Sequence, residues 1–341
     1  MIRKIFVQQK QLFTEAELLE MAAIAQSSPG AIAVNLSVLA GRRTFGIAGA
    51  WISAFGAVLP SFLILALISS CYDAFRTQPL INACLKGMEA GVAALIVQLV
   101  ADMSAAIQTE AEAAACDPAG YLSVCFRLRN SGNDAAFILV LRFPGISVIQ
   151  HKRKPSMSLI LDLFLTFLKI GLFSIGGGYA TLPLIQQQAV VVHPWLTLQE
   201  FTDIITLSQM TPGPLAVNTS TFVGMRLAGM AGAAAATGGC VLCGIVISLA
   251  LQHFFRRNQN QRAVLQLLET LKSASVGLIA ASAATIIMIA LFGVSSWKQT
   301  LHFNPSAFLL FLLALISIQK WKLGPMPILI LSALAGCFFY L

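Results

Sequence analysis

Long apolar runs separated by short polar stretches form the main pattern of the chain. Long apolar runs without a charged residue cover residues 46–70, 229–251, 273–294 and 306–318. A spanning helix needs about 18 consecutive apolar residues, so three of these runs reach spanning length and the last is marginal. The pattern therefore predicts an all-α polytopic membrane protein, with the lipid bilayer as its surroundings.

Composition supports this prediction. Hydrophobic residues make up 57% of the chain and charged residues only 11%, whereas a soluble domain has about 25% charged residues. The net charge of +8 would indicate nucleic-acid binding in a soluble protein. Here most cations lie between apolar runs, where they set topology, so we expect no nucleic-acid partner. Residues 1–13 lack the apolar core of a cleavable signal peptide.

Neither the cysteines nor the histidines form a recognisable chemical site. Cys240 and Cys243 make one isolated CxxC on an apolar segment, with no second pair, and we interpret them as packing residues. No HExxH, Ser/His/Asp order or paired-carboxylate motif occurs. We therefore predict no metal, no cofactor and no enzymatic activity. The histidines are far apart in sequence, at positions His151, His193, His253 and His302.

The segment TPGPLAVN, residues 211–218, places strong helix breakers inside apolar sequence. Unsatisfied backbone groups are costly in hydrocarbon, so such a break is tolerated where it lines a protein-walled cavity. Pro214 suits the first turn of a new helix, and the N–H groups after Gly213 form a positive end that can receive an anion. Asn218, Thr219 and Ser220 are expected to add side-chain donors. A proline kink kept only for packing is the alternative.

A second break lies in FLKIGLFSIGGGYATLPLI, residues 167–185. Its three consecutive glycines, Gly176, Gly177 and Gly178, permit unwinding or close backbone approach. Lys169 lies in the same segment, where an intramembrane lysine is costly unless it reaches the interface. Asp162 lies seven residues earlier on the same predicted helix face, so pairing with Lys169 is an alternative.

The proline segment occurs twice. Residues 14–50 align without a gap onto residues 197–233 at a constant offset of 183, with 15 of 37 positions identical. Average residue usage would give roughly three identities by chance. Two homologous halves in one chain are typical of transporters. The shared positions include Gln26 and Gln209, Pro29 and Pro212, Gly30 and Gly213, Asn35 and Asn218, Gly41 and Gly224, and Arg43 and Arg226.

The distribution of cations predicts that the two halves have inverted orientation. Arg256, Arg257 and Arg262 crowd one loop of the second half, whereas the matching loop of the first half, residues 71–85, carries a single arginine against an aspartate. The positive-inside rule therefore places the arginine-rich loop of the second half in the cytoplasm and the matching loop of the first half outside. All cation-rich segments fall on the cytoplasmic side only if each proline segment is re-entrant, which means that it enters the membrane and returns to the side from which it came.

These residues resemble the chromate ion transporter family. The glycine segment, a Trp-Leu-Thr before Glu-Phe, and QMTPGPLAVNTSTFVGMRLAGMAGA carry the resemblance, which covers almost all of residues 156–341 and residues 5–107 of the first half. It implies a multi-pass carrier in the plasma membrane (the cell inner membrane) that exports chromate, driven by proton motive force, with sulfate as a competitor. The family motifs map onto Gly176, Gly177, Gly178, Gln209, Pro212, Gly213, Pro214, Asn218, Gly224 and Arg226.

The chain departs from the family pattern in its first half. Aligned by the offset, Met1 faces Leu184, so the first half carries no copy of the glycine segment. Its proline motif has Ala31 where the second proline would stand. Residues 116–150 are interrupted by polar and charged side chains. We therefore predict a truncated first repeat over residues 1–115, degenerate last spans and a basic linker over 116–155, and a second repeat over 156–341.

We expect the oxyanion to lie between the two breaks, balanced by Arg43 and Arg226, because a guanidinium can donate two hydrogen bonds to a tetrahedral oxyanion. Proton coupling needs a titratable group at depth. The candidate substrate-binding residues are Gln26, Pro29, Gly30, Asn35, Arg43, Lys169, Gly176, Gly177, Gly178, Gln209, Pro212, Gly213, Asn218 and Arg226, and the candidates for proton coupling are Glu89, Asp102 and Asp162.

Two alternatives stay open. The incomplete first half favours a truncated, non-transporting membrane subunit or scaffold, and the motifs alone fit a carrier of another oxyanion such as sulfate or molybdate. Symport and antiport are equally compatible with the sequence, and a homodimer is one of the assemblies that it leaves open.

Overall fold

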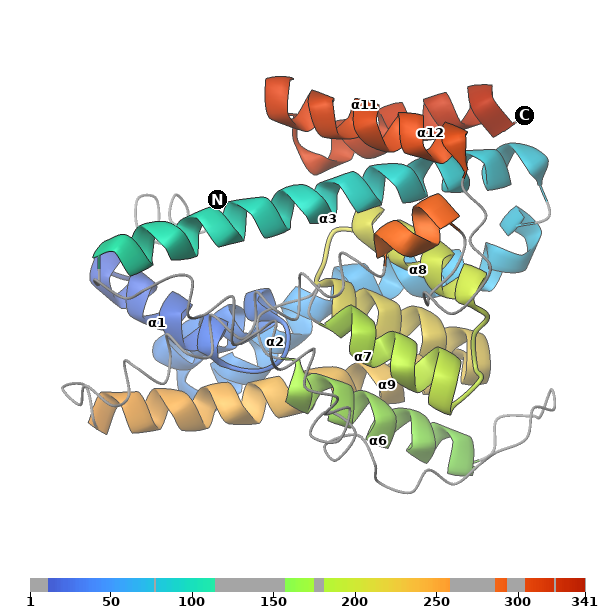
Figure 1. The fold of residues 1–341 in the computed structure, drawn as a ribbon. Coiled ribbons are helices and arrows are strands. Elements are labelled where there is room, and N and C mark those ends of the chain that lie inside the picture. The colour runs from blue at the N-terminus through green and yellow to red at the C-terminus, as the bar shows by residue number, and fades with distance from the viewer. Residues whose placement is uncertain are drawn as a thin grey trace, which may run out of the picture. The chain divides into compact units, whose positions relative to one another are not determined.

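The computed structural model describes residues 12–76, 78–113, 157–174, 181–257, 286–292, 304–321 and 323–340. All regular secondary structure in these residues is helical (Figure 1). Residues 286–292 form a short helical stretch. The other elements are α1 (Glu15–Ser27), α2 (Ile32–Arg76), α3 (Pro79–Ala113), α6 (Met157–Phe173), α7 (Leu182–Gln186), the π-helix η3 (Gln187–Val192), α8 (Leu198–Met210), α9 (Leu215–Arg257), α11 (Pro305–Trp321) and α12 (Pro325–Tyr340).

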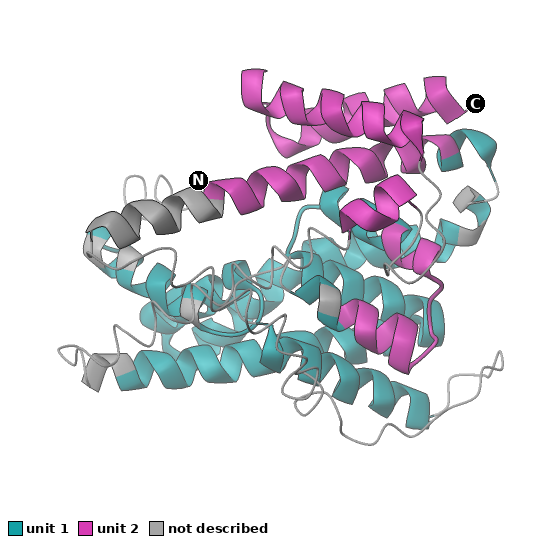
Figure 2. Ribbon diagram, in the orientation of Figure 1, with its two compact units in different colours: residues 1–82, 153–184, 203–272 teal, residues 83–152, 185–202, 273–341 magenta. Residues whose placement is uncertain are grey.

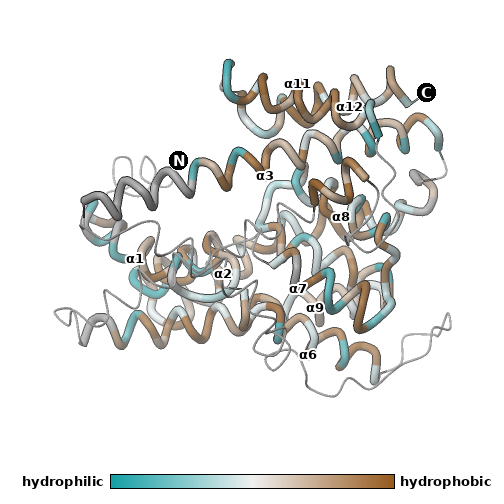
Figure 3. Tube along the Cα trace, in the orientation of Figure 1, coloured by the Kyte–Doolittle hydropathy of each residue, from teal (hydrophilic) through white to brown (hydrophobic). Residues whose placement is uncertain are grey.

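Length and hydropathy confirm the prediction of a multi-pass membrane protein. Among the described residues, three segments are long and apolar enough to cross a membrane, namely Ile32–Tyr72, Pro79–Asp102 and Leu215–Phe254. The shorter helices α11 and α12 are also apolar along most of their length (Figure 3). Leucine, isoleucine and phenylalanine side chains are exposed on α2, α11 and α12, as expected for surfaces that face lipid.

The chain forms two compact units. The first contains residues 1–82, 153–184 and 203–272, and the second contains residues 83–152, 185–202 and 273–341 (Figure 2). Each unit therefore combines segments from both halves of the sequence.

The 183-residue repeat recurs in the secondary structure. Helices α1 and α8 have corresponding bounds, since Glu15–Ser27 shifted by 183 gives Leu198–Met210. Both helices begin with a Thr-x-x-Glu capping box. Glu17 accepts from the Thr14 N–H at 3.0 Å, and Glu200 accepts from the Thr197 N–H at 2.8 Å. The helices that follow, α2 and α9, begin at corresponding residues, Ile32 and Leu215.

Each long helix of the first unit is broken once more, at a second pair of corresponding positions. Phe45 and Gly46 leave helical geometry in α2, and Ala228 and Gly229 do so in α9. The two glycines have nearly the same backbone angles, φ 65° and ψ −150° at Gly46, and φ 62° and ψ −153° at Gly229. This region of φ and ψ is essentially restricted to glycine.

The chain turns back on itself at these glycines. The hydroxyl oxygens of Thr221 and Thr237 are 2.7 Å apart, although sixteen residues of straight helix would separate them by about 24 Å. A side chain on Gly41 would collide with the Gly49 carbonyl, and one on Gly224 would collide with the Gly232 carbonyl. Each of α2 and α9 is therefore a short arm followed by a tightly packed longer arm.

In the first repeat, α1 packs along the short arm of α2. Phe13, Met21, Ile24, Ala25 and Leu39 form one buried cluster. The helix α1 and residues 32–44 therefore make a helical hairpin whose tip is the Pro29–Gly30 break. Helix α6 packs closely on the long arm of α9, because side chains at Gly171 or Gly239 would meet backbone atoms of the facing helix.

In the second unit, α3 and α12 approach through small residues. A side chain on Gly87 would collide with Gly336, and one on Gly91 would meet the Ser332 side chain at 2.6 Å. The spacing of these residues, four apart on each helix, is the small-xxx-small pattern of closely packed membrane helices. Cys84 and Cys337 lie beside the same contact with their Sγ atoms 2.9 Å apart.

We expect Gly46→Ala to lower the stability of the protein by about 1–3 kcal/mol, because alanine is strained at these backbone angles. Gly56→Ala is the matched control, since neither residue has an atom within 4 Å of an added Cβ, and in a regular helix alanine is favoured over glycine by about 1 kcal/mol. Gly229→Ala and Gly238→Ala form the same pair in the second repeat. Apparent unfolding temperatures in detergent measure the effect, and equal shifts within a pair would contradict the turn geometry.

We expect mild oxidation to form a disulfide between Cys84 of α3 and Cys337 of α12, because the close packing of these two helices holds the thiols in contact. Gly336→Val should reduce the crosslink several-fold by pushing the helices apart, whereas Leu334→Val, an exposed position on the same helix, should leave it unchanged. Peptide mass spectrometry measures the yield. An unchanged yield in Gly336→Val would show that the small residues do not hold the two helices together.

Candidate functional site

The Pro-Gly breaks separate α1 from α2 and α8 from α9. The first i to i−4 bonds after the breaks run from the Asn35 N–H to the Ala31 carbonyl and from the Asn218 N–H to the Pro214 carbonyl, each at 2.9 Å. The amides of residues 32–34 and 215–217 precede these bonds and belong to the first turn, which has no intrahelical acceptor. Each break therefore ends in a positive helix terminus.

A buried asparagine closes each break. The Asn218 side-chain amide donates to the carbonyls of Ser208 at 3.0 Å and Thr211 at 3.3 Å. The Asn35 amide donates to the Pro29 carbonyl at 2.9 Å. Both asparagines are almost fully buried. Their role in this structure is to satisfy backbone carbonyls that the broken helix leaves without partners.

The polar side chains after Asn218 are bonded to their own helix. The Thr219 hydroxyl donates to the Leu215 carbonyl and the Ser220 hydroxyl donates to the Val217 carbonyl, both at 2.8 Å. This back-bonding is the usual outcome for Ser and Thr inside a helix, and it uses the donors that the sequence suggested for an anion. The Oδ1 atom of Asn218 and the hydroxyl of Ser208 are among the buried side-chain atoms that have no hydrogen-bond partner in the described part of the chain.

The two breaks differ in access. Gly30 is buried, its N–H donates to the Ser174 carbonyl at 2.7 Å, and Gly244 packs against it. Pro212 and Gly213 are exposed. The second break is therefore exposed at its proline and glycine in this conformation, whereas the first lies under neighbouring backbone.

The contacts of the two breaks are reciprocal. Gly30 packs against Gly244, and Gly213 packs against Ser61. Position 244 is position 61 shifted by 183, as 213 is position 30 shifted by 183. The equivalent residues Val34 and Val217 lie in one buried cluster. The two repeats in this unit therefore contact each other through equivalent residues at the two breaks.

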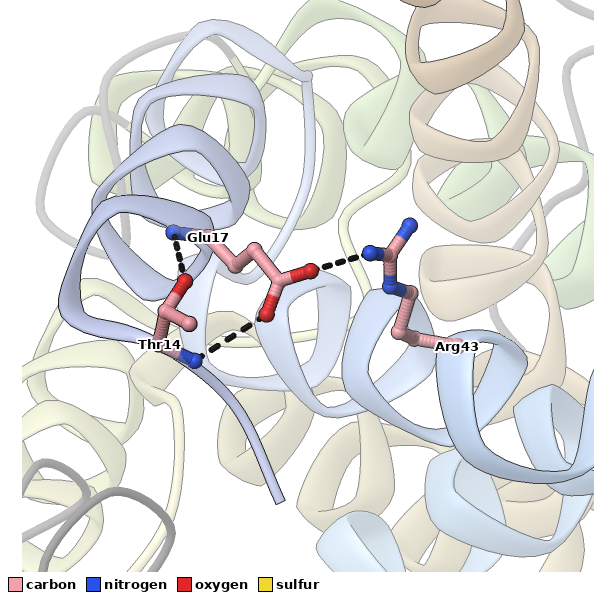
Figure 4. Close-up of polar contacts among 3 residues, drawn as sticks. All are labelled: Thr14, Glu17 and Arg43. Carbon is pink, nitrogen blue, oxygen red and sulfur yellow. Dashed lines mark hydrogen bonds and ion pairs between the residues drawn. The ribbon is translucent and has the colours of Figure 1, made fainter. Parts of the chain in front are cut away.

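The two predicted arginines lie away from the breaks and have different partners. Each follows its glycine by 13 residues, which is about 20 Å of helix. Arg43 forms an ion pair with Glu17, which also accepts from the Thr14 backbone (Figure 4). The Thr14 backbone N–H, and to a smaller degree the Arg43 guanidinium, hold the pKa of Glu17 below its ordinary value.

Arg226 lies over the ring of Tyr72, with its guanidinium carbon 5.0 Å from the ring centroid. The Tyr72 hydroxyl donates to an Asp203 carboxylate oxygen at 2.5 Å, and the ring packs edge-on against Phe222. Tyr72 is only 1% exposed. This end of the second repeat is filled by an aromatic side chain and closed by charged and polar partners.

The remaining candidates are scattered over both units. Gln26 and Lys169 are exposed, and Gln209 and Asp162 are half-buried in the first unit. In the second unit Glu89 is half-buried, and the exposed Asp102 accepts from Gln98 at 2.7 Å. The residues Gly176, Gly177 and Gly178 lie outside the described part of the chain.

Sequence reasoning missed a cavity at the Arg43 end of the first unit. Its volume is about 340 Å³, and Arg42, Arg43, Gln252 and His253 line it. It also missed the Tyr72–Asp203–Arg226 cluster. The duplicated Thr-x-x-Glu motif at 14–17 and 197–200 was a usable signal for the helix starts and for the engagement of Glu17. No local pattern brings residues 42 and 252 together, since they are 210 positions apart.

The family model described as Chromate transporter matches residues 1–149 and 161–337. A probable chromate transport protein of Synechococcus elongatus is 26% identical over 98% of this chain and 88% of its own length, and a chromate transport protein of Cupriavidus metallidurans is 25% identical over 98% and 86%. The uncharacterized transporter YwrB of Bacillus subtilis is 22% identical over 52% of this chain and 87% of its own length. No solved structure matches the chain.

Proposed function

The chain belongs to the chromate transporter family, and on that premise we propose that it is a membrane carrier that exports chromate, with sulfate as a competing substrate. The observation that carries the proposal is the match of the family to both halves, each of which contains a helix pair broken at an equivalent Pro-Gly. Broken helices of this kind build substrate sites in secondary transporters.

We propose that the dianion binds at the positive helix termini beside the breaks. Gly213 is exposed, whereas Leu215, Ala216 and Val217 are buried, so binding at the amides of residues 215–217 requires the second break to open. Gly30 is covered by Gly244 and bonded to Ser174, and movement of those elements would expose the first terminus instead. Asn35 and Asn218 act as positioning residues that keep the breaks open to this role.

The directions of the helix arms within the first unit support inverted halves. Ser61 of α2 contacts Gly213, and eight residues later in α2 the Ser69 hydroxyl donates to the Phe222 carbonyl of α9. The contacts advance in the same direction along both segments, so the long arm of α2 runs parallel to the short arm of α9. The short and long arms of α9 are antiparallel because the chain turns back at Gly229. The long arms of the two repeats therefore run in opposite directions, as the cation distribution predicts for halves of opposite orientation.

Proton motive force is the proposed energy source. The candidates for carrying the proton remain Glu89, Asp102 and Asp162, and among them Glu89 and Asp162 are half-buried on apolar helices. A carboxylate removed from water at this depth is a functional candidate by default.

The rival function is a non-transporting membrane subunit or scaffold, favoured by the charged and polar side chains that interrupt residues 116–150 of the first half. Chromate accumulation in everted membrane vesicles with and without the protein separates the two functions. Energy-dependent uptake supports the carrier, and uptake equal to that of control vesicles overturns it. Radiolabelled sulfate in the same assay tests the alternative substrate.

We expect Asn218→Ala and Arg226→Ala each to reduce chromate resistance of expressing cells to the level of cells without the protein. Asn218→Ala leaves two buried carbonyls without their donor, and Arg226→Ala removes the cation from the Tyr72 ring. Ser317→Ala is the control, since that exposed hydroxyl bonds only to its own helix. Immunoblots of membrane fractions check the protein level, and unchanged resistance in both variants would remove these residues from the site.

The inverted arrangement predicts opposite accessibility at equivalent positions. Cys71 is exposed at the end of α2, and Phe254 is its equivalent in α9, with 47% of its surface exposed. A membrane-impermeant maleimide applied to intact cells should label a variant whose only cysteine is Cys71. It should label a variant whose only cysteine comes from Phe254→Cys after permeabilisation alone. Labelling of both from the same side would show that the halves are parallel.

A further inference from the structure

We propose that the cavity lined by Arg42, Arg43, Gln252 and His253 is a second binding site for a tetrahedral dianion. The bound anion replaces Glu17 as the ion-pair partner of Arg43. The proposal rests on the proposed function, since the ligand class is the same. The site is separate from the Pro-Gly breaks, because Arg43 lies about 20 Å of helix from Gly30.

The side chains of the cavity suit an oxyanion. Two guanidinium groups come from consecutive residues of α2, and the Arg42 group is fixed by donating to the Leu249 carbonyl at 3.1 Å. Gln252 is only 7% exposed and adds an amide donor, and His253 stands at the exposed side. Guanidinium groups match tetrahedral oxyanions because they donate two hydrogen bonds in one plane. The volume of about 340 Å³ leaves room for an ion with part of its water shell.

Glu17 acts as an internal competitor for this site. Its carboxylate pairs with Arg43 (Figure 4), and together with Glu20 it lines a smaller hollow beside the cavity. The charged and titratable groups that line the cavity and the smaller hollow are Glu17 and Glu20 of α1, Arg42 and Arg43 of α2, and His253 of α9. Two carboxylates balance two guanidinium groups, so a dianion gains full attraction only when Glu17 releases Arg43.

The equivalent end of the second repeat is occupied by side chains. Gln252 and His253 correspond to Ser69 and Ser70, and Arg43 corresponds to Arg226. There the Tyr72 ring occupies the space between helices, Ser69 donates to the Phe222 carbonyl at 3.2 Å, and Arg226 covers the ring. The end of the second repeat is therefore filled by side chains, whereas the end of the first repeat contains a cavity lined by two arginines.

Equilibrium binding of radiolabelled sulfate and of chromate to the purified full chain in phosphatidylcholine nanodiscs tests the proposal. Arg43→Gln should weaken binding by roughly tenfold or more, since charge-assisted hydrogen bonds are lost. Glu17→Gln should tighten it several-fold because Arg43 is released. Lys320→Gln, which removes one positive charge from α11, should leave the affinity unchanged. Misfolding cannot produce the opposite effects of Arg43→Gln and Glu17→Gln.

A second arm distinguishes a free oxyanion from a lipid phosphate of the same chemistry. Sulfate affinity that is equal in phosphatidylcholine and in phosphatidylglycerol nanodiscs supports the free ion. Loss of sulfate binding whenever phosphatidylglycerol is present would assign the cavity to lipid headgroups and overturn the proposal.

The outcomes separate this site from the carrier function. Unchanged affinities in Arg43→Gln and Glu17→Gln, with chromate flux retained, overturn the cavity site and leave the carrier intact. The expected affinity changes in a protein that moves no chromate support the site and overturn the carrier. A wild-type chain that binds neither anion overturns the site.

Discussion

The structure of the first unit depends on how backbone groups at a broken helix find partners in apolar surroundings. An unsatisfied peptide group costs several kcal/mol in hydrocarbon, so a Pro-Gly break is stable only where something replaces the missing helical bonds. Asn35 and Asn218 supply that replacement from inside the following helix. With the breaks satisfied, the chain can present helix termini at depth, and the packing of α1, α2 and α9 follows from where those termini lie.

Much of this arrangement could be predicted from the chain itself. Apolar runs predicted the spanning segments, and the 183-residue offset predicted equivalent breaks at Gly30 and Gly213, because identical residues in identical order share local conformational preferences. The second pair of turns, at Gly46 and Gly229, was not predicted. Both lie at the edge of long uncharged runs, where periodicity gives no reason to expect a reversal, and only the glycine identity at equivalent positions hinted at it.

The partners of the charged side chains could not be predicted. Arg43 and Arg226 are equivalent in sequence, yet one pairs with a carboxylate and the other covers an aromatic ring. That difference arises from residues elsewhere in the chain: the Tyr72 ring lies against Arg226, and Glu17 of α1 lies against Arg43. The 183-residue offset between the repeats shows which positions are equivalent, whereas long-range packing decides which residues each position contacts.

The reciprocal contacts also bear on how such a chain arises. Two separate copies of a single repeat could make the Gly30–Gly244 type of contact twice, across a self-complementary interface, and a relative of about half the length exists. When the two copies are joined in one polypeptide, their sequences no longer have to be identical. Divergence can then bury one glycine while exposing its twin, which gives a duplicated ancestor the directionality that a strictly symmetric pair lacks.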